Sequence, residues 1–170
     1  MTDNFSINYD QYLLEVGQPG LVRKVAGSIV DRTVEDIEQM DEGREFCIKG
    51  ENIRGIWVRT LISSGPEAID DASDDTTTDH IDWGNYKHLR TKILIADSEE
   101  VLSEAWWGTE GTVHHSWLLG TKKYGGGDFE SRRYLEQNGE VLVCESIFHQ
   151  SNDEEGTDNA AITWKFKRDD

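Results

Sequence analysis

The sequence predicts an all-β protein, a closed antiparallel β-barrel capped by two short helices. After about residue 30, nine short runs are rich in β-branched and aromatic residues, and they often alternate apolar with polar positions. Turn signals such as DEG, GEN, GTEG, GGGD and QNGE separate these runs. Many short strands at regular spacing are typical of sandwiches and barrels. The single helical pair near the start favours a small barrel with a cap.

The helical cap, or lid, is predicted over residues 8–30. In NYDQYLLEVG, Asn8 is a candidate N-cap with Gln11 three residues later, and Gly17 ends the helix. After QPG, apolar residues recur at helical spacing. They are Leu21, Val22, Val25, Ala26 and Ile29.

Nine strands are predicted after the lid, and a candidate tenth strand, DNFSIN, precedes it. A barrel of about ten strands is near the size at which the interior holds a ligand as well as side chains. In chain order, the nine runs span 33–40, 44–50, 53–62, 86–96, 99–107, 112–124, 128–136, 140–148 and 160–168.

Two acidic stretches interrupt the strands and are predicted to be solvated loops. The longer one, over 63–84, holds seven acids and neither Lys nor Arg. The shorter one, over 151–158, separates the last two strands.

The composition fits one domain, over residues 1–170, with a highly charged surface. A chain of 170 residues can bury a core without disulfides. Its 34 acids and 17 bases give a net charge of −17. Nucleic-acid binding depends on Lys and Arg that neutralise phosphates, so we do not expect a nucleic acid as partner.

Cysteine use and hydropathy favour a cytoplasmic protein. Cys47 and Cys144 lie far apart in strand-like runs, so neither a disulfide nor a metal site is expected. The first ten residues lack the basic and apolar regions of a secretory signal. No apolar run approaches the ~20 residues that span a membrane. We expect a cytoplasmic monomer without a cofactor.

Three segments, in this order, resemble the intracellular lipid-binding proteins, which include the fatty-acid- and retinoid-binding proteins. YDQYLLEVGQPGLVRKVAG is similar to that family's lid, F/Y-D-x-Y-L/M…G-V-G followed by R-K-x-A. LLGTKKYGGGDFESRRYLEQNGEVLVCESIF is similar to its hairpin, a K-W-D-G-K turn followed by I-K-R and L-V-V-E-C. AITWKFKR stands where the family ends with T-R-x-Y. The resemblance implies a ten-stranded up-and-down barrel with a helical lid and a cavity for a hydrophobic small molecule.

The resemblance also implies an inward arginine. Counting from Tyr124, which stands at the family's turn tryptophan, places Arg133 at that position. Strand alternation puts one set of side chains on the same face as this arginine. The set is Phe129, Ser131, Arg133 and Leu135. Arg133 would contact a ligand anion, or it would pair inside the barrel with a water or with an acid such as Glu145 or Glu104.

The last strand departs from the family. There the Arg and Tyr of T-R-x-Y grip the ligand carboxylate, but here Trp164 and Phe166 stand in their places and Lys165 is expected to point outward. The two rings either pack in the core or form the wall of a cavity. The predicted ligand-binding residues are Arg133, Ser131, Trp117, Phe148, Trp164 and Phe166, and the predicted lid residues are Tyr12, Leu21 and Val25.

The function predicted from these features is intracellular binding and transport of a fatty acid, a retinoid or a pigment-like lipid. No phosphate loop, G-x-S-x-G or HExxH motif indicates catalysis. One alternative is an enzyme on the same barrel, which an inward His would favour. His114 and His115 are neighbours and would point to opposite faces of a strand. A second alternative is a protein-binding module that uses residues 63–84.

Overall fold

The computed structural model describes residues 9–29, 34–52, 55–64, 90–95, 99–108, 111–151 and 160–168. Two helices precede nine strands in this part of the chain. The helices are α1 (Tyr9–Glu15) and α2 (Gly20–Ile29). The strands are β1 (Val34–Met40), β2 (Glu45–Asn52), β3 (Gly55–Ser64), β4 (Arg90–Leu94), β5 (Glu100–Trp107), β6 (Val113–Thr121), β7 (Gly127–Glu136), β8 (Val141–His149) and β9 (Ala160–Lys167).

The nine strands and both helices confirm the elements predicted from the sequence. The candidate tenth strand, over residues 3–8, lies outside the described residues, and so does nearly all of the acidic stretch over 63–84. The exceptions in that stretch are Ser63 and Ser64, which form the end of β3 and not the start of a loop. None of the helices in the described ranges has the length and apolar character that a membrane span requires.

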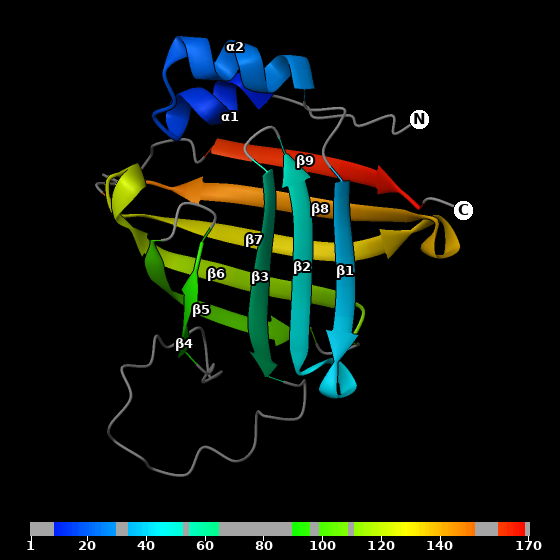
Figure 1. The fold of residues 1–170 in the computed structure, drawn as a ribbon. Coiled ribbons are helices and arrows are strands. Elements are labelled where there is room, and N and C mark those ends of the chain that lie inside the picture. The colour runs from blue at the N-terminus through cyan, green and yellow to red at the C-terminus, as the bar shows by residue number, and fades with distance from the viewer. Residues whose placement is uncertain are drawn as a thin grey trace.

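The strands form one sheet in the order β1-β2-β3-β5-β6-β7-β8-β9, with β4 paired to β5. Neighbours along the chain pair in antiparallel fashion except β3 and β4, and a short parallel contact joins Ser63 of β3 to Ala105 of β5. In Figure 1, β1, β2 and β3 cross in front of β5 to β9, so the sheet curls into a nearly closed barrel. The two edge strands of this order are β1 and β9.

One end of the barrel interior is filled by the helix α1. Tyr12 of α1 and Val16, which follows the end of α1, are buried against Phe148, Ala160 and Ile162 on the inner face of β8 and β9. The Tyr12 hydroxyl lies 3.3 Å from Ser146 Oγ, and the ring of Tyr9 meets Trp164 edge-on at 5.2 Å. Burial of these side chains fixes α1 to the barrel by the hydrophobic effect.

The sequence predicts that α2 helps to seal the barrel, but in the structure it does not. It packs against α1, and α1 in turn packs against β9. Leu21 is therefore 76 % exposed and Val25 is 40 % exposed. Of the three predicted lid residues, only Tyr12 reaches the barrel interior, because a layer of α1 separates α2 from the strands.

A second core cluster lies on the inner face of β2, β3 and β5. Phe46, Ile48, Leu61 and Ala105 are buried there. The ring of Trp57 lies directly over Gly50, where a Cβ atom would approach the ring to 2.2 Å. The close approach of this tryptophan to the neighbouring strand therefore requires glycine at position 50.

Candidate functional site

A cavity of about 1660 Å³ occupies the end of the barrel away from α1. Among the described residues, its wall has more polar and charged side chains than apolar ones. The apolar part includes Ile37, Phe46, Trp107, Leu142 and Phe166. The polar part includes Glu35, Ser63, His114 and Arg133.

Strand register places Arg133 on the inner face, as the sequence predicts. Arg133 pairs with His114 on β6 and with Cys144 on β8, and Cys144 pairs with Trp164 on β9. The next residue back, Arg132, belongs to the outer face, where Glu130 Oε1 accepts a hydrogen bond from its Nη2 at 2.8 Å. Alternation along β7 therefore gives two adjacent arginines opposite roles.

The guanidinium of Arg133 is buried and incompletely satisfied. The residue is 6 % exposed. Its Nη1 donates to Ser116 Oγ over a long distance of 3.5 Å, and its buried Nε has no hydrogen-bond partner among the described residues. A buried charge with unsatisfied donors is costly unless a counter-charge or a hydrogen-bond acceptor reaches it.

Glu35, which the sequence did not indicate, lines the same cavity and interacts electrostatically with Arg133. Its Oε2 is buried without a hydrogen-bond partner in the described part of the chain. Burial raises the pKa of Glu35, and the charges of Arg133 and Arg59 partly oppose this. The only sequence signal was alternation on β1, which puts Glu35 on the same face as Ile37.

The two acids expected from the sequence lie elsewhere. Glu145 is on the outer face, where its Oε1 accepts a hydrogen bond from the Tyr134 hydroxyl at 3.1 Å. Glu104 is also on that face and forms an ion pair with Arg90. Neither acid pairs with Arg133, because both occupy strand positions whose side chains point to the outer face, whereas Arg133 points inward.

His114 is the inward member of the histidine pair. Its Nε2 lies 2.8 Å from Ser63 Oγ, and its ring stacks on Phe46 with 3.9 Å between ring centroids. Burial lowers the pKa of His114 to about 3, helped by the charges of Arg133 and His115. The ring is therefore neutral at physiological pH, and its Nδ1 is buried without a partner among the described residues.

The other predicted ligand-binding residues separate into distinct regions. Phe166 lines the cavity, whereas Phe148 and Trp164 belong to the core beneath α1. Ser131 lies on the inner face between them, paired with Ser116 and Ser146.

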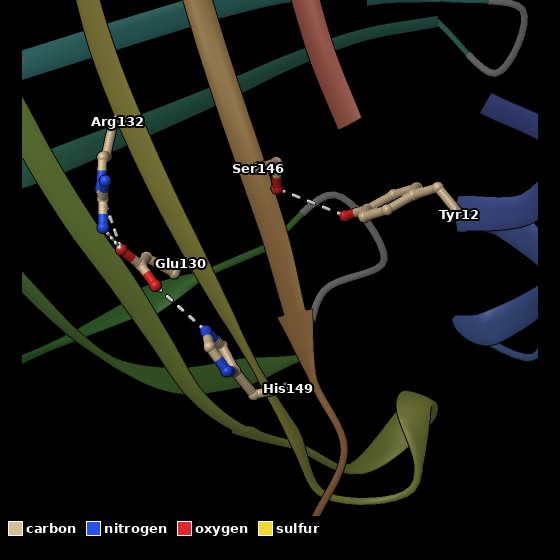
Figure 2. A network of polar contacts seen from close by, with 5 residues as sticks. All are labelled: Tyr12, Glu130, Arg132, Ser146 and His149. Carbon is tan, nitrogen blue, oxygen red and sulfur yellow. Dashed lines mark hydrogen bonds and ion pairs between the residues drawn. The ribbon is translucent and has the colours of Figure 1, made fainter. Parts of the chain in front are cut away.

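Trp117 is on the outer face, paired with Glu104 and Glu130, and does not face the interior. Its ring stacks on His149 at 4.8 Å. His149 Nε2 lies 3.1 Å from Glu130 Oε2. Figure 2 shows this contact, the contact of Glu130 with Arg132, and Tyr12 reaching Ser146 from α1. The prediction that Trp117 lines the cavity is therefore wrong, because Trp117 occupies the same face of the sheet as its partner Glu130.

Ser63 and His114 have the groups of a nucleophile and a general base, but His114 binds a proton too weakly to act as the base. A general base works best with a pKa near the working pH, and the pKa of His114 is about 3. No group of three His, Cys, Asp or Glu side chains within the described ranges is arranged to hold a metal ion. The arrangement suits binding of a small amphipathic molecule better than acyl transfer.

No protein-family model and no curated protein matches the chain. Among solved structures, a mutant of the fatty acid transporter REP1-NXSQ matches with a TM-score of 0.54 and 15 % sequence identity. The match covers 96 % of this chain and 91 % of that one. At this identity the likeness concerns the fold. The chain therefore has the barrel fold of the intracellular lipid-binding proteins, the family that its lid and C-terminal strands resemble.

Proposed function

We propose that this protein binds and carries a hydrophobic small molecule with an anionic end in the barrel cavity, as a cytoplasmic monomer and without catalysis. A fatty acid, a retinoid acid or a pigment-like lipid fits this description. The observation that carries the proposal is Arg133, a buried cation on the wall of a large, partly aromatic cavity, whose Nε has no hydrogen-bond partner among the described residues.

A bound anion would relieve the least favourable feature of the interior. A carboxylate accepts two parallel hydrogen bonds from a guanidinium, which are among the strongest that proteins make. Such a bond to a charged group contributes about 1.5–3 kcal/mol. The apolar body of the ligand would then lie against Phe46, Leu142 and Phe166, where each buried CH₂ group adds about 0.8 kcal/mol.

The last strand differs from that of the lipid-binding proteins, and this difference changes which residues can contact the ligand. Trp164 and Phe166 stand where the family has the Arg and Tyr that hold a carboxylate, so Arg133 alone keeps the family's position. Of the two rings, Phe166 lines the cavity and stacks on Trp164 with centroids 6.5 Å apart. We propose that Phe166 contacts the apolar body of the ligand.

The test begins with native mass spectrometry and organic extraction of the gently purified protein, followed by titration with a fluorescent fatty acid and with retinoic acid. Arg133→Ala should weaken binding by about ten- to a hundredfold, the equivalent of roughly 1.4–2.8 kcal/mol. The matched control is Arg132→Ala, because Arg132 has the same charge but lies on the outer face. Equal losses in the two variants, or a wild-type protein that binds neither probe, would contradict the proposal.

The Ser63–His114 hydrogen bond supports a second candidate, an enzyme on the same barrel. It would hydrolyse an ester bound in the cavity, with Ser63 as nucleophile. Incubation with long-chain nitrophenyl esters and with a fluorophosphonate probe tests this. Turnover or labelling that Ser63→Ala abolishes would establish it, whereas their absence from the wild-type protein leaves the carrier.

A further inference from the structure

We infer that the ligand enters and leaves through a mouth at the end of the barrel opposite α1, not past the helices. The mouth is formed by three turns at 41–43, 111–112 and 139–140, together with Arg168 at the end of β9. This inference rests on the proposed function and adds the route to the cavity.

The turns of the mouth contribute directly to the cavity wall. Asp41, Glu42, Thr112 and Glu140 all line the cavity and are exposed to solvent. A cavity wall that includes exposed residues from three separate turns opens to solvent between them. In Figure 1, the turn between β1 and β2 and the turn between β7 and β8 both lie away from α1.

The opposite end is closed by packed side chains. Tyr12 of α1 is 9 % exposed and Val16 is 7 % exposed, and they pack against Phe148 and Ile162 on the barrel wall. A ligand passing this way would have to displace α1, expose these side chains and break the contact between Tyr12 and Ser146. Close-packed cores resist such displacement.

Movement of α2 alone would not uncover the cavity. α2 packs on α1, and Leu21 on its surface is 76 % exposed. The described residues of α2 do not appear in the wall of the cavity. The apolar side chains of α2 therefore do not act as a plug that swings away from the cavity.

The order of inner residues along β7 agrees with this route. Phe129 belongs to the core beneath α1, Ser131 follows it, and Arg133 and Leu135 line the cavity near the β7–β8 turn. A ligand that enters with its apolar end first would leave its anion at Arg133, close to the mouth. The anion would then never cross the apolar core, where an unpaired charge is costly.

The route is tested by the kinetics of binding an anthroyloxy-labelled fatty acid in a stopped-flow instrument. The mouth variant carries Thr112→Trp and Glu140→Trp, and the matched helix variant carries Leu21→Trp and Lys24→Trp. Each variant replaces one uncharged and one charged exposed residue. We expect the mouth variant to slow association and dissociation together by about tenfold, which corresponds to a barrier of about 1.4 kcal/mol. The helix variant should keep both rates.

A second measurement avoids any effect of the substitutions on folding. Thr112→Cys or Leu21→Cys is labelled with a bulky maleimide after folding, in a Cys47→Ser background, because Cys144 is buried. A label at position 112 should slow binding and a label at position 21 should not. Slowing confined to the helix variant and the position-21 label would overturn the route while leaving the proposed carrier intact. A wild-type protein that binds no probe would refute both.

Discussion

Arg133 and Arg132 are adjacent in the chain, yet their side chains lie in opposite environments. Arg133 is buried on the cavity wall, whereas the side chain of Arg132 is 47 % exposed and pairs with Glu130. Only the alternation of side chains along the strand distinguishes them, since both are arginines with the same intrinsic chemistry. The structure confirms the predicted inward position of Arg133 and the predicted outward position of Lys165. For His114 and His115 the sequence predicted only that they occupy opposite faces. The pairing of Lys165 with Glu136 at 2.7 Å is on the outer face.

Replacing Glu35 with Gln should strengthen binding of an anionic ligand. Glu35 and Arg133 line the same cavity, so a Glu35 carboxylate competes with the ligand for the positive charge of Arg133. Loss of that competition should raise the affinity for an alkyl sulfonate several-fold, by roughly 1 kcal/mol. The affinity is measured by isothermal titration calorimetry at neutral pH.

The control for this prediction is Glu38→Gln, on the same strand but at an exposed position of the other face. It should leave the affinity unchanged. Because burial raises the pKa of Glu35, the wild-type affinity for the sulfonate should also rise as the pH falls through that pKa, and Glu35→Gln should lose this dependence. A weaker Glu35→Gln complex would show that Glu35 does not compete with the sulfonate for the charge of Arg133.

His114 should make the fold sensitive to acid. The unfolded chain takes up a proton at this residue near pH 6.5, but the folded protein does so only near pH 3. The unfolded state therefore binds more protons between these values, and the free energy of unfolding should fall by up to about 1.4 kcal/mol per pH unit as the pH drops through this window. Urea unfolding of the wild type and of His114→Asn at several pH values measures the slope. A variant with the wild-type slope would rule out His114 as its source.

At the scale of elements, local sequence patterns predict the strands, but contacts between elements determine whether a glycine is required at a given position. Gly27 of α2 and Gly50 of β2 look alike in the sequence. A Cβ at Gly27 would meet nothing within 4 Å, whereas one at Gly50 would meet the Trp57 ring at 2.2 Å. The difference arises because the exposed helix leaves Gly27 open, while the register of β2 and β3 places Gly50 opposite Trp57.

Alanine should therefore have opposite effects at the two glycines. Gly50→Ala should destabilise the protein by about 1–3 kcal/mol because the Trp57 ring must move away. Gly27→Ala should stabilise it by about 0.5–1 kcal/mol, since alanine favours an exposed helix more than glycine does. Chemical denaturation measures both changes. Trp57→Leu should relieve most of the Gly50→Ala defect, and a defect that survives this second substitution would have another origin.

At the scale of the whole molecule, the barrel interior is divided into a packed end and a hollow end. α1, Phe148, Ile162 and Trp164 fill the packed end. Phe46, Phe166, His114 and Arg133 surround the hollow end. The packed end of the barrel therefore forms a rigid base, and the hollow end leaves space in which a ligand can bind. A ligand that occupies the hollow end should stabilise the whole barrel.

Saturating fatty acid should raise the melting temperature. A ligand at 100 times its dissociation constant adds about 2.7 kcal/mol to the stability of the folded state. For a chain of 170 residues, each kcal/mol corresponds to about 2–4 °C, so a rise of roughly 5–10 °C is expected. Differential scanning fluorimetry should show this rise for the wild type and for Arg132→Ala and a much smaller one for Arg133→Ala. An equal rise in all three would place the ligand away from Arg133.

The sequence by itself predicted the strands and the lid helices, because periodicity and turn chemistry are local properties of the chain. The inward position of Arg133 was implied by the resemblance to the lipid-binding proteins. Tertiary structure alone decided that Glu35, Ser63, His114 and Arg133 line one cavity, since they come from four different strands, β1, β3, β6 and β7. It also decided that Phe148 and Trp164 lie beneath α1 while Phe166 lines the cavity. Alternation tells which face a side chain occupies, but the elements that pack against that face determine whether it meets a core or a cavity.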